Sequence, residues 1–232
     1  MSSINIKITQ LIDGAKKAEG LTVIIDVFRA FTVACYLKDN GAKRIIPIGN
    51  IDKAYFLQKN NPDYIIIGER GGEIQKGFDF GNSPFDIANI DFTGKTIVHT
   101  TSAGTQGIVG AIHADEVITG SFVNAKAIAK YLKLKNPDMV TLVAMGNAGT
   151  HYAQEDVLCA QYIKSLLEEN PLDKDEIIHK LRHGDGAKFF DPKMNHIFPQ
   201  GDFDLCMAFN KFDFILKVEP YKNNLLQLIP YY

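Results

Sequence analysis

Short apolar runs alternate with amphipathic stretches along most of the chain. Residues 4–8 alternate between apolar and polar positions, which is typical of a half-exposed edge strand. The runs that follow are mostly apolar and therefore predict strands covered on both faces. These predicted strands lie at 22–25, 45–48, 64–67, 96–99, 117–119 and 140–144, with a last one at 212–218.

Helical stretches with recognisable capping residues lie between these strands. Residues 30–39 have helical character and stop at Asn40-Gly41, because a glycine there can adopt the left-handed backbone that ends a helix. Further helices are predicted at 50–58, before residue 113, and at 121–133, 154–168 and 173–184. Their predicted caps are Asn50, Ser121 or Asn124, and Asp173 with Glu176 in a capping box.

The alternation of covered strands and helices predicts an α/β fold with three α/β/α layers around a mostly parallel, mixed sheet. No low-complexity linker interrupts it, so we expect a single domain over residues 1–232. The segments 22–50 and 96–122 share the order strand, polar turn, helix, strand. They are either an internal duplication or two βαβ units under the same local rules, and we favour the second. We expect the polar, Phe-containing segment 184–204 to pack as a loop over another part of the protein.

Composition and charge narrow the function classes. The 232 residues are 46% hydrophobic and 22% charged, as in ordinary globular proteins. A net charge of −2 gives no indication of nucleic-acid binding. Three cysteines without a CxxC pair argue against a disulfide framework and fit a reducing compartment. Because we see no secretory signal and no apolar run of membrane-spanning length, we expect a cytoplasmic protein that does not bind membranes.

Polar residues follow several predicted strands, and ligands of such sheets bind beyond the carboxyl ends of the strands. These residues are Asp26 and Arg29, Glu69 and Arg70, Thr100, Thr101 and Ser102, Ser121 and Asn124, and Glu155 and Asp156. Each of them also has an ordinary structural explanation, as a helix cap, an ion pair or a charge that complements a helix dipole. Their expected convergence on one rim is more informative than any of them alone.

Together these residue types indicate a site for a small polyanionic substrate. Hydroxyl and glycine residues at helix N-termini expose backbone N–H groups, which bind anions, and arginines clamp acidic oxygens through paired hydrogen bonds. Carboxylates in the same place would repel an anion unless a cation lies between them. Mg²⁺ suits that position because it takes oxygen ligands and can activate water. The chain has no GxxxxGK[ST] motif, so a P-loop nucleotide site is not indicated.

Several uncommon segments occur in a specific order along the chain. They are VIIDVFRAFT, GERGG, GFDFGNSP, GKTIVHTTSAGT, GSFVNAKAIA and QEDVLCAQYI, followed by the weaker DFDLCMAFNKFD. In this order they resemble the 2-phosphosulfolactate phosphatase family, which acts in coenzyme M biosynthesis in methanogens and occurs widely in bacteria. The resemblance implies an α/β fold and a Mg²⁺-dependent phosphatase that converts (2R)-2-phospho-3-sulfolactate and water to (2R)-3-sulfolactate and phosphate. A homodimer would fit the family.

The resemblance also implies roles for individual residues. The expected catalytic residues are Asp26, Arg29, Glu69, Arg70 and Asp156. We expect Asp26 and Asp156 to be metal ligands or to handle protons, with Glu155 and Glu69 ranked behind them. The expected substrate-binding residues are Asn82, Ser83, Thr100, Thr101, Ser102, Gly104, Thr105, Ser121 and Asn124. We expect the loop GERGGEIQKGFDFGNSP to form one wall of the pocket, the alternative being a loop braced by a structural Glu–Arg pair.

Two positions depart from the family's usual pattern. Phe31 stands where the family usually has Thr after Arg-Ala, and it adds bulk beside Arg29. Ala103 stands where the family usually has Asn, so the turn expected to touch the substrate lacks a polar side chain. The alternatives are therefore a phosphatase of the same chemistry on another small phosphorylated hydroxy acid, and a non-catalytic protein that binds an anion.

Overall fold

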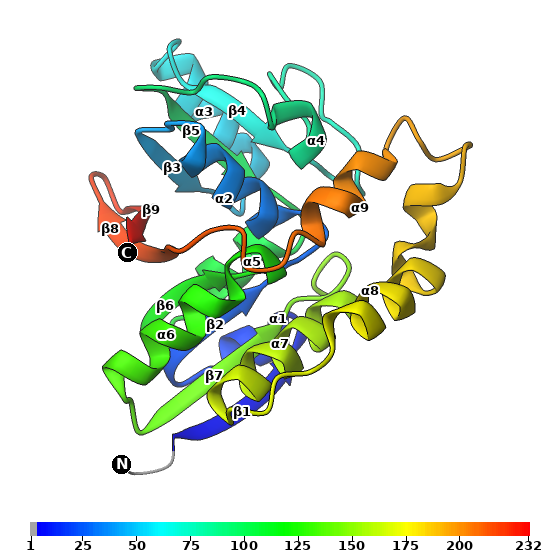
Figure 1. The fold of residues 1–232 in the computed structure, drawn as a ribbon. Helices are drawn as coiled ribbons and strands as arrows, with labels where there is room; N and C mark the ends of the chain where they lie inside the picture. The colour runs from blue at the N-terminus through cyan, green and yellow to red at the C-terminus, as the bar shows by residue number, and fades with distance from the viewer. Residues whose placement is uncertain (1–3) are drawn as a thin grey trace.

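The computed structural model describes residues 4–232, which form one nine-stranded sheet with helices on both faces (Figure 1). The strands are β1 (Asn5–Gln10), β2 (Gly20–Ile25), β3 (Arg44–Pro47), β4 (Ile65–Gly68), β5 (Thr96–Thr100), β6 (Ala114–Gly120), β7 (Met139–Ala144), β8 (Ile215–Tyr221) and β9 (Leu225–Tyr231). The α-helices are α1 (Leu11–Lys16), α2 (Ala30–Asp39), α3 (Ile51–Asn60), α4 (Pro84–Ile87), α5 (Gly104–Gly110), α6 (Ala125–Lys135), α7 (Gln154–Leu167), α8 (Lys174–His183) and α9 (Gln200–Cys206). Two 3₁₀ helices are η1 (Phe122–Asn124) and η2 (Asp185–Phe190).

The sheet consists of two parallel groups of strands joined by a hairpin. Its strand order is β1-β7-β2-β6-β8-β9-β3-β5-β4. The first four strands are mutually parallel, and so are the last three. β8 and β9 pair antiparallel with each other and with their neighbours β6 and β3. The predicted α/β class with a mostly parallel, mixed sheet is therefore confirmed.

The hairpin is predicted only in part from the sequence. The strand expected at 212–218 begins later, at Ile215, and β9 was not predicted. Asn223 and Asn224 turn the chain between β8 and β9 with positive φ angles of 58° and 57°. Asn tolerates this left-handed backbone better than most residues, so an Asn-Asn pair between two apolar runs is a usable signal for the missing turn.

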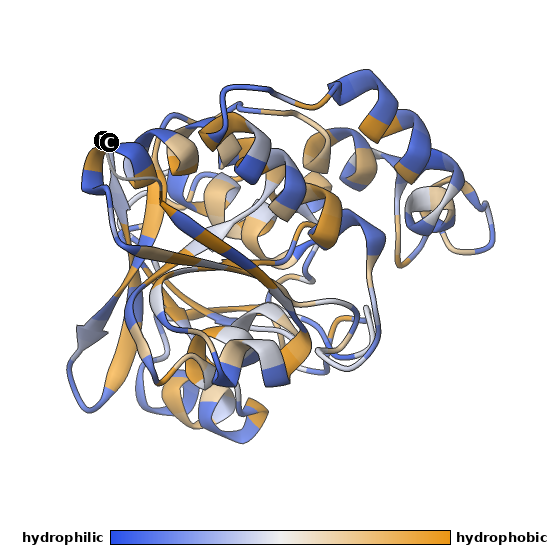
Figure 2. Cartoon of the chain, turned by 90° about the horizontal axis from the view of Figure 1, so that it is seen from below, coloured by the Kyte–Doolittle hydropathy of each residue, from blue (hydrophilic) through white to orange (hydrophobic). Residues whose placement is uncertain are grey.

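Strand side chains alternate between the two faces of the sheet and build a core on each. Ile24 of β2 packs with residues of α1, α2 and α5 on one face. Val23 and Ile25 pack with α6 and α7 on the other face. Figure 2 shows the apolar strands between helices whose outer surfaces are hydrophilic. Because both faces are covered, β2 lacks the polar alternation of a surface strand.

All six predicted helices form, as α2, α3, α5, α6, α7 and α8, and their caps lie where the sequence places them. The side chains of Asn50 and Asp173 accept hydrogen bonds from the first turns of α3 and α8. Ser121 and Asn124 together form a capping box around η1, so both predicted caps are used and α6 begins one residue later. α5 ends at residue 110 rather than 113, because the backbone of Ala111 leaves the helical region with a ψ of 52°.

The segment 184–204 packs over another part of the protein, as expected. It contains η2 and most of α9, which appear in yellow and orange in Figure 1. Phe189 and Phe203 are buried and pack against Phe28, which follows β2. The segment therefore covers the region where the chain leaves the carboxyl end of β2.

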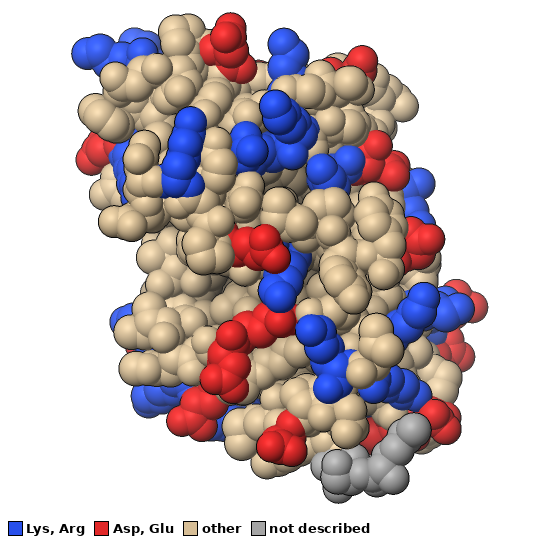
Figure 3. Space-filling view, turned by 90° about the vertical axis from the view of Figure 1, so that its left-hand side faces the viewer, with Lys and Arg blue, Asp and Glu red and all other residues tan. Residues whose placement is uncertain are grey.

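The face of the molecule shown in Figure 3 has no single dominant charge. On the face shown in Figure 3, basic and acidic side chains both recur between uncharged areas. This distribution agrees with the net charge of −2. None of the helices described for residues 4–232 combines the length and the apolar character that crossing a membrane requires.

Candidate active site

The structure has a pocket of about 340 Å³ beyond the carboxyl ends of β2, β4, β5 and β7. The predicted site residues that line it are Asp26, Arg29, Glu69, Asn82, Ser102, Glu155 and Asp156. Lining residues that the sequence did not single out as site residues include Phe28, Asn147, Ala148, Lys188 and Phe198. Four of the five expected strand ends therefore meet at one pocket, and the strand end after β6 does not.

Asp26 directly follows β2, and its carboxylate holds two segments of backbone. Oδ1 accepts a hydrogen bond from the N–H of Ala30 at 3.1 Å, and Oδ2 accepts one from the N–H of Gly104 at 2.8 Å. A Cβ on Gly104 would lie 2.8 Å from Oδ2, so this approach requires glycine. Burial raises the pKa of Asp26 to about 6, against the effect of these hydrogen bonds, and the charge of Glu69 adds to the rise.

Asp156, in the first turn of α7, is held in the same way. Its Oδ1 accepts from the N–H of Val27 and its Oδ2 from the N–H of Gly146, both at 2.8 Å. These bonds tie the ends of β2 and β7 to α7. Burial raises the pKa of Asp156 well above its ordinary value, and the neighbouring charges of Glu155 and Asp26 raise it further.

Of the acids that line the pocket, Glu155 is the one with a buried carboxylate oxygen that lacks a hydrogen-bond partner among the described residues. It is 4% exposed, and its Oε2 is buried without a hydrogen-bond partner in the described part of the chain. Burial raises its pKa to about 7, although the charge of Lys188 opposes this rise. A proton or a cation is therefore required at Glu155 to compensate its buried charge.

Glu69 braces the glycine-rich loop GERGG after β4. Its Oε1 accepts from the N–H of Ser102 at 2.6 Å, and its Oε2 accepts from the Ser102 hydroxyl at 3.0 Å and the N–H of Gly72 at 2.8 Å. Arg70 instead donates to the hydroxyl of Thr100 at 2.8 Å and to backbone carbonyl groups, and it does not line the pocket. The loop forms one wall of the pocket without an ion pair between Glu69 and Arg70.

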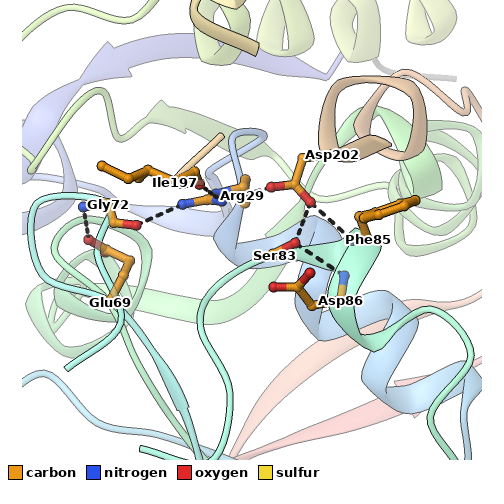
Figure 4. Close-up of polar contacts among 8 residues, drawn as sticks. All are labelled: Arg29, Glu69, Gly72, Ser83, Phe85, Asp86, Ile197 and Asp202. Carbon is orange, nitrogen blue, oxygen red and sulfur yellow. Dashed lines mark hydrogen bonds and ion pairs between the residues drawn. The ribbon is translucent and has the colours of Figure 1, made fainter. Parts of the chain in front are cut away.

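Arg29 is buried in a network that joins the glycine-rich loop to the segment 184–204 (Figure 4). Its Nη1 donates to Asp202 Oδ2 and to the carbonyl of Ile197, both at 2.7 Å, and its Nη2 donates to the carbonyl of Gly72 at 3.0 Å. Asp202 also accepts from the hydroxyl of Ser83 at 2.6 Å. Asp202 was not predicted from the sequence, and it places Ser83 in this network rather than on the pocket wall.

Asn82 is oriented by a buried histidine. Nε2 of His99 lies 3.1 Å from Oδ1 of Asn82. Burial lowers the pKa of His99 to about 4, so the ring is neutral at pH 7. Because an amide oxygen can only accept, Nε2 must carry the proton, and Asn82, which lines the pocket, keeps its amide nitrogen as a donor.

Seven of the predicted substrate-binding residues do not line the pocket. They are Ser83, Thr100, Thr101, Gly104, Thr105, Ser121 and Asn124. Thr101 and Thr105 bond to each other through backbone N–H and hydroxyl groups at 2.9 and 3.2 Å. The hydroxyl of Ser121 lies 2.7 Å from the hydroxyl of Thr32 in α2. These residues form the packed layer that supports the pocket wall.

The two departures from the family pattern lie in different environments. Ala103 lines the pocket, so the missing polar side chain does change its wall. Phe31 is 1% exposed and lies in the core, where its ring would be 3.0 Å from a Cβ on Gly104. Phe31 therefore adds bulk beneath the wall rather than inside the pocket.

The acids of the pocket do not form a complete metal-ligating cluster among the described residues. Across residues 4–232, no set of three Asp, Glu, His or Cys side chains has the geometry to hold a metal ion. Three acids of the pocket nevertheless interact: the charge of Asp26 raises the pKa values of Glu155 and Asp156, and the charge of Glu155 raises that of Asp156.

The fold and the site define the class: an α/β protein with an acid-lined pocket at the carboxyl ends of its strands. The family model described as 2-phosphosulpholactate phosphatase matches residues 6–219. The chain therefore belongs to the 2-phosphosulfolactate phosphatase family, which confirms the resemblance seen in the sequence.

Three relatives illustrate this similarity, and each is named "Probable 2-phosphosulfolactate phosphatase". The Bacillus subtilis protein is 34% identical over 203 residues, which cover 86% of this chain and 87% of the relative. The Caldicellulosiruptor saccharolyticus protein is 36% identical over 66% of this chain and 64% of its own length. The Thermotoga petrophila protein is 38% identical over 72% of this chain and 66% of its own length.

Proposed function

We propose that the protein is a phosphoric monoester hydrolase that converts (2R)-2-phospho-3-sulfolactate and water to (2R)-3-sulfolactate and phosphate, with Mg²⁺ as its cofactor. The observation that carries this proposal is the trio of buried carboxylates Asp26, Glu155 and Asp156 at the strand ends of a member of this family. The names of the relatives support the phosphatase reaction and its substrate.

The residues present fit a magnesium ion. A magnesium ion does not need a set of three protein ligands, because Mg²⁺ is usually held by one or two carboxylates together with water and substrate oxygens. Oε2 of Glu155 is buried and has no partner, and a hard cation would compensate it. Asp26 and Asp156 lie beside it in the pocket with both oxygens already fixed by backbone N–H groups. We propose that Glu155 and one or both aspartates hold Mg²⁺. The bound ion would polarise the phosphoryl group and neutralise its charge.

The other pocket residues bind and orient the substrate. Asn82 donates its amide N–H groups to an oxyanion, in an orientation fixed by neutral His99. If Asp156 rather than Asp26 joins Glu155 at the metal ion, Asp26 is left to handle a proton, because a pKa of about 6 lets its carboxylate accept and release one near neutral pH. Arg29 positions the two walls of the pocket, since Asp202 and backbone carbonyl groups occupy its donors.

A panel of phosphorylated hydroxy acids tests the substrate. We expect the highest kcat/KM for 2-phospho-3-sulfolactate among that compound, 2-phospholactate and phosphoglycolate, measured by phosphate release with Mg²⁺. A higher value for either sulfonate-free compound would contradict the assignment and favour the same chemistry on another small hydroxy acid. Saturable binding without phosphate release from any of them would identify a non-catalytic anion-binding protein.

A further inference from the structure

Lys188 is the positively charged side chain of the pocket that the protein leaves free. Arg29, the other cation in the pocket lining, is committed to Asp202 at 2.7 Å and to two backbone carbonyl groups. Lys188 lines the same pocket from η2. Its ammonium group has no ion pair and no hydrogen bond to any residue between 4 and 232.

Three aromatic rings hold this ammonium group in place. Nζ of Lys188 lies 5.7 Å from the ring centroid of Phe28, 5.5 Å from that of Phe189 and 5.0 Å from that of Phe198. Ring faces attract a cation but take up its N–H donors only weakly, so the three donors remain available to a ligand. Because the rings already restrict the side chain, it loses less freedom on binding than a solvated surface lysine would.

The charges of the pocket separate two subsites. The acids Asp26, Glu155 and Asp156 surround the place where a cation would meet a phosphate group. Lys188 lines the same pocket as these acids, yet its ammonium group stands among phenyl rings. A sulfonate spreads its charge over three oxygens and is desolvated more easily than a carboxylate, so it suits a subsite with one ammonium group and apolar walls.

We propose that Lys188 binds the sulfonate of the substrate and is a specificity-determining residue. This role of Lys188 rests on the proposed function, because the substrate's identity comes from there. Among the described residues that line this acid-rich pocket, Lys188 is the cationic side chain left available to an anionic group of the substrate.

The first test compares a substrate that carries a sulfonate with one that lacks it. In Lys188→Gln, kcat/KM for 2-phospho-3-sulfolactate should fall about 10-fold to 100-fold through KM, whereas that for 2-phospholactate should change less than twofold. Lys188→Arg should recover part of the loss, and Lys193→Gln, an exposed lysine of the same segment, should change neither value. An equal loss for both substrates, or no loss, would overturn the proposal and leave Lys188 as a packing residue.

A binding measurement separates this proposal from the proposed function. Calorimetry with Mg²⁺ should show that 3-sulfolactate binds the unchanged protein about 10-fold or more tightly than it binds Lys188→Gln. If the unchanged protein released no phosphate but this difference remained, the phosphatase assignment would fail and the sulfonate subsite would stand. If 3-sulfolactate bound both proteins equally, or neither, the subsite would be wrong whatever the activity.

Discussion

The buried acids of the pocket differ in how well the protein compensates them. Asp26 and Asp156 each receive two backbone N–H groups, whereas Oε2 of Glu155 receives none. A carboxylate in that position destabilises the folded chain when it is ionised and no metal ion is present. Such an arrangement is typical of a site that trades stability for function.

Glu155→Gln should stabilise the metal-free protein at pH 8 by about 1–3 kcal/mol. The folded chain keeps a proton on Glu155 up to a pKa of about 7, whereas the unfolded chain releases it near 4.5. The stability from this protonation is therefore complete below pH 4.5 and is lost as the pH rises through about 7. Urea unfolding in EDTA at pH 5 and pH 8 measures the difference.

Glu168→Gln, at the exposed end of the same helix, provides the control and should change stability by less than about 0.5 kcal/mol. If Glu155→Gln were no more stable than the unchanged protein at pH 8, the buried charge would be compensated in some other way. The same result would weaken the assignment of Glu155 as a metal ligand.

Side-chain directions limit what the sequence reveals about single residues. The positions of Asp26 and Asp156 could be predicted, because each lies at a strand end or helix start that the apolar pattern marks. The direction of Arg70 could not, because it depends on Thr100 of β5, the neighbouring strand in the finished sheet. The supporting role of Thr101 and Thr105 has a local origin instead, because each hydroxyl group accepts from the other residue's backbone N–H group inside the turn.

At the scale of elements, the segment 184–206, which contains η2 and α9, covers the pocket. The guanidinium group of Arg29 helps to hold this cover in place. Arg29 reaches Ile197 and Asp202 on that segment and Gly72 on the glycine-rich loop. A single ammonium group cannot span three such acceptors. The position of this cover therefore depends on arginine at residue 29.

Arg29→Lys should loosen the segment 184–206 and lower the free energy of unfolding by about 2–3 kcal/mol, through lost hydrogen bonds to a buried charged group. Hydrogen exchange should accelerate in this segment and in residues 69–72 more than in the strands of the sheet. KM for the substrate should rise together with this exchange, because the pocket walls are less well positioned.

The exposed pair Lys133–Glu169, at 2.9 Å, offers a matched control. Lys133→Gln should cost about 0–1 kcal/mol and leave exchange in the segment 184–206 unchanged. Unchanged exchange there in Arg29→Lys would show that the aromatic contacts alone hold the cover.

The cover illustrates a second limit of sequence analysis. Its apolar residues follow neither a helical nor a strand period, so only loose packing over a neighbour could be predicted. The decisive pair, Arg29 and Asp202, is 173 residues apart in the chain and has no local signal. The helices α2, α3 and α8 were predictable because their caps and stops lie within the helices' own sequence.

At the scale of the whole molecule, the β8–β9 hairpin connects the two parallel groups of strands. Leu228 of β9 pairs with Ile45 of β3 at the junction and is 1% exposed. The pocket takes residues from both groups, Asp26 from one and Glu69 from the other. The site therefore depends on a hairpin distant from it in sequence.

Leu228→Ala should lower the free energy of unfolding by about 2–5 kcal/mol, because it leaves a cavity at this junction. Thermal or urea unfolding measures the change. Leu134→Ala makes the same chemical change at a side chain that is 71% exposed, and it should cost less than about 0.5 kcal/mol. Equal effects of the two substitutions would contradict the joining role of the hairpin.

The sequence predicts the fold class well and the strand order poorly. Most covered strands and most helices follow from local periodicity, so the α/β class could be inferred, although α1, α4, α9 and β9 were not predicted. The insertion of an antiparallel hairpin between two parallel groups depends on pairings between segments far apart in sequence, which no local pattern records. The convergence of strand ends was predictable only as a rule for such sheets.

The most direct test of the central claim is phosphate release from 2-phospho-3-sulfolactate by the purified protein, with Mg²⁺ and with EDTA, alongside Asp26→Asn. We expect release with Mg²⁺, loss of release in EDTA that added Mg²⁺ restores, and a reduction of about 100-fold or more in folded Asp26→Asn. Metal-independent release, no release from a folded sample, or near-normal turnover in Asp26→Asn would contradict the claim that this acid-lined pocket is a magnesium-dependent phosphatase site.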